Sequence, residues 1–114
     1  MQNLRYVGKT LFIEKLSVNN IVKKNKTPFY LYSENQIINN YLKFTKNFKK
    51  TNPLVCFAAK SNSNVAILKI LGKLGAGADV VSGGELLKAL KAGIKASKIA
   101  VSYTHLRAHE TESN

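Results

Sequence analysis

A regular alternation of short apolar runs with amphipathic helical patterns begins at residue 28, and it limits the possible folds more than any other feature. The apolar runs start near Pro28, Leu54, Ala78 and Ile99, and these starts are 26, 24 and 21 residues apart. Strands that alternate with helices in this way build parallel sheets with right-handed crossovers. The chain therefore predicts an α/β fold, and the spacing alone leaves open a doubly wound sheet or the first half of a (β/α)8 barrel.

The segments between the apolar runs carry the start and stop signals of helices. Apolar residues recur at helical spacing through 33–50, where Ser33 and Gln36 have capping-box spacing. A second helix is expected over 63–75 and a third over 82–93, and each ends at a glycine. The strands are expected at 28–33, 54–60, 78–82 and 97–101.

Residues 1–27 form a separate segment ahead of this alternation. Partial strand alternation over 5–16, with a turn at Gly8, precedes a short helix expected at 17–26 with Ser17 as its cap. We therefore expect a short β-segment in front of the α/β units of 28–100.

The formal net charge of +12 raises the question of nucleic-acid binding. Sixteen of the 18 basic residues are lysines spread along most of the chain, without the interleaved aromatic residues that stack on bases. We interpret these lysines as solvated faces, and we expect no nucleic-acid partner.

Apolar run length and cysteine content indicate the compartment. No apolar run is long enough to span a bilayer, and no apolar region follows the basic residues of the amino terminus as it would in a signal peptide. The single cysteine, Cys56, allows neither an intrachain disulfide nor a cysteine-based metal site. We expect a cytoplasmic protein without a membrane contact or a bound metal.

The carboxyl-terminal residues depart from the alternating pattern. The stretch VSYTHLRAHET, 101–111, matches the conceptual translation of a transposase adapter used in sequencing libraries. We therefore expect the genuine protein sequence to stop near Ala100 and residues 101–114 to derive from such an adapter. His105 and His109 have the spacing of a metal pair on a helix, but on this interpretation they have no function.

A lysine at the end of the apolar run 54–60 is the first candidate for chemistry. Lysine is rarely buried without a partner or a function, and Lys60 would lie at the carboxyl end of a strand, where α/β folds place their active sites. Partial desolvation would favour its neutral amine, which can attack an aldehyde carbonyl. Position alone still favours a lysine that extends from the strand end into solvent.

Three stretches resemble a known enzyme family. TPFYLYSENQI, NPLVCFAAKSNSN and LGAGADVVSGGELLKALKAGI are similar, in order and spacing, to the amino-terminal part of the diaminopimelate decarboxylase family. The most specific parts are A-x-K-x-N at 58–62 and D-x-x-S-x-G-E at 79–85. The resemblance covers most of residues 10–100 and implies the amino-terminal part of a pyridoxal-phosphate-binding (β/α)8 barrel of the alanine-racemase-like group, with 1–27 belonging to the family's β-domain.

The resemblance also implies roles for individual residues. Lys60 would form a Schiff base with pyridoxal phosphate, Ala58 would lie beside the cofactor ring, and Asp79 would lie near the cofactor and orient its surroundings. Glu85 matches a family acid, although its capping-box position with Ser82 is a sufficient structural explanation, and Gly83 and Gly84 fit a helix start. The family's catalytic cysteine lies in a much later segment, so we expect Cys56 to be a core residue.

The activity implied by the resemblance is the decarboxylation of meso-2,6-diaminopimelate to L-lysine and CO2. The partners implied are a small amino-acid substrate and, for the full-length protein, a second copy in a homodimer. The family's phosphate-binding glycine loop, ring-stacking histidine, acid at the pyridine nitrogen and substrate-carboxylate arginine have no counterpart in these residues. We therefore expect a truncated fragment that is inactive by itself.

Two other interpretations stay open on the sequence. A decarboxylase of the same group could act on ornithine, arginine or a carboxynorspermidine-type substrate, because the segments that select the substrate are missing. A basic binding module without enzymatic activity would show salt-dependent affinity for nucleic acid and no cofactor absorbance.

Overall fold

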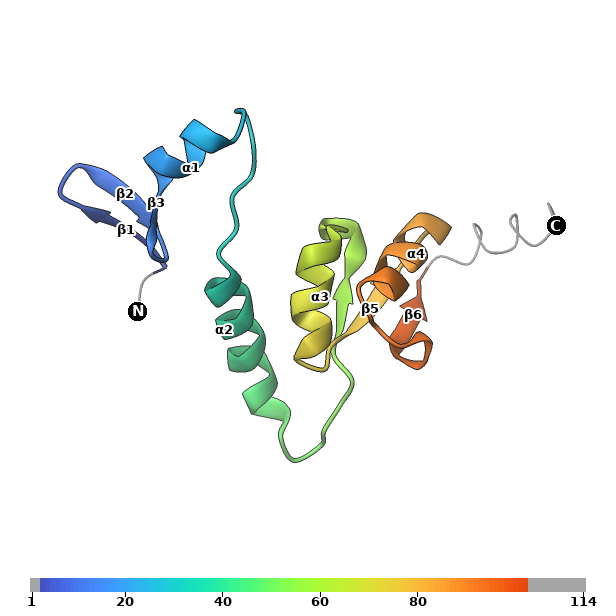
Figure 1. Ribbon diagram of the computed structural model, residues 1–114. Coiled ribbons are helices and arrows are strands. Elements are labelled where there is room, and N and C mark those ends of the chain that lie inside the picture. The colour runs from blue at the N-terminus through green and yellow to red at the C-terminus, as the bar shows by residue number, and fades with distance from the viewer. Residues whose placement is uncertain (1–2, 103–114) are drawn as a thin grey trace. The chain divides into compact units, whose positions relative to one another are not determined.

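The computed structural model describes residues 3–102, and the chain divides into two compact units, Met1–Asn40 and Tyr41–Asn114 (Figure 1). The first unit begins with an antiparallel sheet of β1 (Leu4–Val7), β2 (Thr10–Ile13) and β3 (Leu16–Ser17). Helix α1 (Val18–Lys24) follows directly, and Ser17 Oγ accepts a hydrogen bond from the Asn20 N–H at 3.2 Å. The predicted β-segment, the turn at Gly8 and the Ser17 cap are confirmed.

Helix α2 (Glu34–Thr45) begins at a cap that the sequence predicts only in part. Ser33 Oγ accepts from the Gln36 N–H at 3.1 Å, as expected. The Gln36 side chain does not return to the cap, because it bonds Asn3 and Asn40. Glu14 forms the second side-chain hydrogen bond at the cap, because its carboxylate accepts from the Ser33 hydroxyl at 2.9 Å.

The strand predicted at 28–33 is wrong. This segment is irregular in the structure, and its side chains Phe29, Tyr30, Leu31 and Tyr32 are exposed. A strand exists through hydrogen bonds to a neighbouring strand, and residues 3–102 supply none to this segment. An apolar run shows that a segment can enter a sheet, but the partner decides whether it does.

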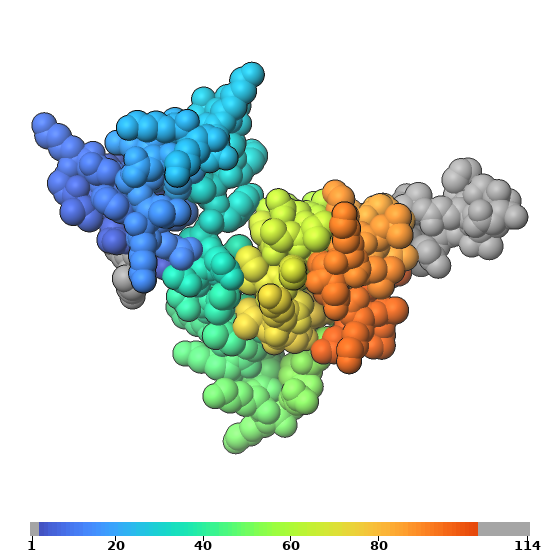
Figure 2. All heavy atoms as spheres, viewed as in Figure 1, coloured from blue at the N-terminus to red at the C-terminus, as the bar shows by residue number. Residues whose placement is uncertain are grey.

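The second unit is built on a parallel sheet in the order β4–β5–β6, which confirms the predicted topology class. Its strands are β4 (Cys56–Ala58), β5 (Gly77–Val80) and β6 (Ile99–Val101), connected by α3 (Val65–Lys73) and α4 (Gly83–Lys91). In the space-filling view the yellow atoms of α3 lie against the orange atoms of α4 (Figure 2). None of the helices in residues 3–102 combines the length and apolarity needed to cross a bilayer.

Both helices of this unit end as the glycines predict. Gly75 has φ of 100°, and its N–H donates to the Gly72 carbonyl oxygen while the Ala76 N–H donates to the Leu71 carbonyl oxygen. Gly93, with φ of 92°, ends α4 in the same way. Positive φ is open to glycine without the strain that a Cβ atom brings, so both positions require it.

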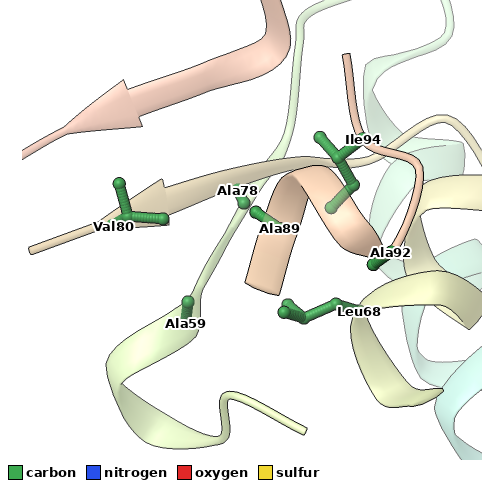
Figure 3. Packing of buried hydrophobic residues seen from close by; sticks show 7 residues of the cluster. All are labelled: Ala59, Leu68, Ala78, Val80, Ala89, Ala92 and Ile94. Atoms are coloured by element: carbon green, nitrogen blue, oxygen red, sulfur yellow. The ribbon is translucent and has the colours of Figure 1, made fainter. Parts of the chain in front are cut away.

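The core of the second unit lies between the sheet and the two helices. Leu68 of α3 and Val80 of β5 are almost completely buried, and alanines fill the space around them (Figure 3). Small side chains at these positions let the helices and the sheet approach closely. The cluster consists of Ala59, Leu68, Ala78, Val80, Ala89, Ala92 and Ile94.

The opposite face of the same sheet carries small side chains. Side chains alternate along a strand, so the residues next to the helix-facing Phe57, Ala78 and Ile99 along each strand point the other way. A Cβ atom at Gly77 would overlap the Lys98 carbonyl oxygen and lie 2.9 Å from Cys56 Sγ. The residues on this face, called the open face below, are Cys56, Ala58, Gly77, Asp79 and Ala100.

Candidate functional site

Lys60 follows β4 directly, within a short 3-10 helix formed by Ala59–Ser61. Ala59 is completely buried in the core cluster, while the Lys60 side chain is exposed. Within residues 3–102, Lys60 has neither a hydrogen-bond nor an ion-pair partner. The strand-end position is therefore confirmed, but the partial burial expected for Lys60 is not provided by the residues that the structure describes.

Asp79 lies on the neighbouring strand at the same end of the sheet. It is paired in register with Ala58 of β4 on one side and Ala100 of β6 on the other. These neighbours are about 4.8 Å away across the sheet, and the side chain of each is a single methyl group. Asp79 is the only acidic residue that residues 3–102 place on the open face.

Ser102 bonds the Asp79 carboxylate, and the sequence did not indicate it. Its hydroxyl donates to Asp79 Oδ1, and its N–H donates to the Val80 carbonyl oxygen at 3.1 Å. The interpretation of 101–114 as adapter sequence leaves no role for Ser102, so it does not predict this contact. Register alone could have suggested it, since Ser102 follows β6 on the strand next to Asp79.

Three other residues singled out from the sequence have structural roles. Glu85 Oε1 accepts from the Val81 N–H at 3.0 Å, and Ser82 Oγ accepts from the Glu85 N–H at 3.1 Å. The Ser82 contact confirms the cap of α4, while the Glu85 carboxylate bonds the N–H one residue before the cap instead of the N–H of Ser82. Cys56 is half-buried, and burial raises the pKa of its thiol, with a further rise from the Asp79 carboxylate. Cys56 is therefore a protonated thiol at neutral pH and a poor nucleophile.

Residues 3–102 contain no group of three or more metal-ligating side chains. His105 and His109 lie outside the described residues. The site consists of one lysine, one carboxylate and small side chains.

A cavity of about 670 Å³ lies at the other end of the sheet, away from these residues. Its lining includes Val55, Gly75 and Lys98, which precede β4, β5 and β6 along the chain. Lys60 follows β4 and Asp79 lies next to the last residue of β5, so neither belongs to this cavity. We place the candidate site at the carboxyl ends because the side chains able to do chemistry lie there.

The residues at the carboxyl ends fit a cofactor that is attached through an aldehyde. Such a cofactor needs a primary amine that is open to approach, and the Lys60 side chain is exposed. A planar ring also needs space beside the amine, and the nearby open face offers the methyl groups of Ala58 and Ala100. Pyridoxal phosphate has both the aldehyde and the planar ring.

Known proteins are similar to this chain in sequence and in fold. The family model described as "Pyridoxal-dependent decarboxylase, pyridoxal binding domain" matches residues 34–111. The diaminopimelate decarboxylase of Helicobacter pylori (strain J99) is 49% identical over 87 residues, which cover 76% of this chain and 22% of that protein. The match to the family model runs past Ala100, so the proposed boundary of the tail stays a prediction.

Solved structures agree with the sequence matches. The diaminopimelate decarboxylase of M. jannaschii gives a TM-score of 0.82 at 36% identity, over 89% of this chain and 25% of that one. The structure of SrLDC in complex with PLP and cadaverine gives a TM-score of 0.67 at 29% identity, over 87% of this chain and 24% of that one.

The chain spans about a quarter or less of the length of these relatives. The expected resemblance to diaminopimelate decarboxylases is confirmed, and so is the fold class, the amino-terminal part of a pyridoxal-phosphate-binding α/β barrel. The chain belongs to the pyridoxal-dependent decarboxylases, and residues 34–111 match the pyridoxal-binding domain of that family.

Proposed function

We propose that this chain is part of a pyridoxal-phosphate-dependent decarboxylase that converts meso-2,6-diaminopimelate to L-lysine and CO2. The observation that carries the proposal is the position of Lys60 at the carboxyl end of β4, inside a stretch similar to diaminopimelate decarboxylases. When bound, pyridoxal phosphate supplies an electron sink for the carbon that loses CO2.

Three residues of this chain have different proposed roles at the site. Lys60 Nζ would hold the cofactor at its aldehyde carbon, with release of water, and would be the amine that gives way to the substrate amine. The methyl group of Ala58 leaves room for the ring on the open face. The Asp79 carboxylate would orient the groups around the cofactor through its negative charge.

We further propose that catalysis needs more residues than these 114. Decarboxylation requires a held phosphate, a protonated ring nitrogen and an aligned carboxylate, and Lys60, Ala58 and Asp79 provide none of these. The full protein would be a cytoplasmic homodimer with a small amino-acid substrate. Residues 1–27 would belong to its β-domain, and 101–114 to a sequencing adapter, which the genomic sequence after the codon for Ala100 would test.

The proposed choice of substrate is tested by a decarboxylation assay on a protein of the relatives' length that contains this chain. It is supplied with meso-diaminopimelate, ornithine or arginine, and CO2 and amine products are measured. We expect L-lysine from meso-diaminopimelate and at least tenfold lower kcat/KM on the others, since a site that pairs with a substrate's polar group rejects analogues lacking it. Faster turnover of ornithine or arginine would contradict the assignment. The 114 residues alone should release no CO2 above the level of free cofactor.

A further inference from the structure

The backbone around Lys60 is anchored, while the lysine side chain has no partner in residues 3–102. Ala59, the residue before it, is completely buried against the core, which fixes one side of the 3-10 helix. The direction in which the lysine leaves the strand end therefore depends on how the other side of the turn is held.

Hydrogen bonds from the residues after Lys60 hold that other side. Ser61 Oγ donates to the Ala58 carbonyl oxygen at 2.8 Å, which ties the turn back to the last residue of β4. The Asn62 N–H donates to the Ala59 carbonyl oxygen at 3.2 Å, and Asn62 Oδ1 accepts from the Asn64 N–H at 3.1 Å. Because Asn64 caps α3, the turn is braced between strand and helix.

We propose that Ser61 is a positioning residue for Lys60, acting through its hydroxyl bond to the Ala58 carbonyl oxygen. The inference rests on the proposed function, because it concerns Lys60 as the point of cofactor attachment. An amine attacks an aldehyde efficiently when it is held within reach and in the right direction. Loss of one hydrogen bond of this kind should slow cofactor attachment about two- to tenfold.

The chain offers a matched control two residues away. Ser63 also carries a hydroxyl, but it accepts from Lys88 Nζ at 3.2 Å and makes no bond to the turn that holds Lys60. The variants are therefore Ser61→Ala as the test, Ser63→Ala as the control and Ser61→Thr, which keeps the hydroxyl.

Two rates are measured in a protein of the relatives' length that contains this chain. The first is the rate of pyridoxal phosphate attachment after the cofactor has been removed, followed by the visible absorbance of the adduct and mapped to its lysine. The second is the hydrogen exchange rate of the Asn62 amide, which reports the turn without cofactor. We expect Ser61→Ala to slow attachment and to speed exchange about two- to tenfold, and Ser61→Thr to restore both.

Three results would overturn the proposal. Equal attachment rates in Ser61→Ala and Ser63→Ala would show that the hydroxyl does not position Lys60. Faster exchange without slower attachment would show that the bond stabilises the turn and does nothing more. An adduct on another lysine in the parent protein would overturn the proposed function itself, independently of the variants.

Discussion

The two units of the chain are stabilised by different kinds of interaction. Of the eleven apolar side chains that are buried in residues 3–102, ten lie in Tyr41–Asn114 and one, Ile13, lies in Met1–Asn40. The second unit therefore has an apolar core of its own, shared by the sheet and two helices. The first unit buries two polar residues, Asn3 and Ser33, and is held largely by hydrogen bonds.

Glu14 is the centre of the hydrogen-bond network in the first unit. Its carboxylate accepts from the Ser33 hydroxyl at 2.9 Å and the Asn35 N–H at 3.4 Å, and its N–H donates to the Asn3 carbonyl oxygen. It adopts φ of 51°, which is strained for a residue with a Cβ atom. The comparison shows that the second unit relies on apolar packing, whereas the first relies on hydrogen bonds centred on Glu14.

The largest expected effect is a loss of stability in the second unit when its apolar core is changed. Leu68→Ala removes a side chain with no exposed surface and leaves a cavity among alanines that cannot fill it. We expect the free energy of unfolding of the second unit to fall by about 2–5 kcal/mol, measured by denaturant titration. Leu87→Ala, at a side chain that is 68% exposed, is the control, and an equal loss there would refute the account of the core.

The next effect concerns the polar network. Glu14→Ala removes the acceptor for Ser33 and Asn35, and it keeps a Cβ atom at the positive φ, so the strain remains. We expect the free energy of unfolding of the first unit to fall by about 1–2 kcal/mol. This loss would be seen as faster amide exchange at the start of α2. The amides of β5 in the second unit serve as the internal reference. Unchanged exchange at Asn35 and Gln36 would contradict the role given to Glu14.

A smaller effect is expected at the end of α3. Gly75→Ala places a Cβ atom at φ of 100°, and no atom lies within 4 Å of it, so the cost is backbone strain alone. We expect the free energy of unfolding of the second unit, measured in a thermal or denaturant melt, to fall by about 1 kcal/mol. Gly84→Ala, in the first turn of α4 and without positive φ, should be neutral or slightly stabilising. Equal losses at both glycines would show that strain is not the cause.

The smallest effect is on the titration of Cys56. Burial raises its pKa first and the Asp79 carboxylate second, so the thiolate forms at higher pH in the folded chain than in the unfolded one. Any stability gained from the neutral thiol is present below the unfolded pKa, about 8.5, and is lost as pH rises through the folded value. The pH profile of alkylation should therefore have a higher midpoint in folded protein, and Asp79→Asn should lower it. A folded midpoint at or below the unfolded one would contradict this.

The sequence predicted those elements whose determinants are local. Capping at Ser17, Ser33 and Ser82, and the glycines that end α3 and α4, depend on residues a few positions apart. The parallel sheet followed from apolar runs that alternate with helices. The strand at 28–33 was wrong because a strand depends on a distant neighbour, which no local pattern contains.

The sequence indicated where the candidate site residues lie, and it did not indicate two hydrogen bonds beside them. Lys60, Ala58 and Asp79 lie at the same end of the sheet, as the strand order requires. The Ser102 bond to Asp79 joins two residues that are 23 positions apart, and the Ser61 bond depends on the local turn geometry. Serine and asparagine after a strand are common turn formers, so their types alone did not identify these contacts.

Reduction of the cofactor adduct tests the central claim most directly. A protein of the relatives' length that contains this chain is loaded with pyridoxal phosphate, treated with borohydride and digested, and the labelled peptide is identified by mass spectrometry. We predict a single label on Lys60, and none on that peptide in the Lys60→Arg variant, which keeps the charge but has no primary amine. A label on any other lysine, or an unchanged label in the variant, would contradict the account.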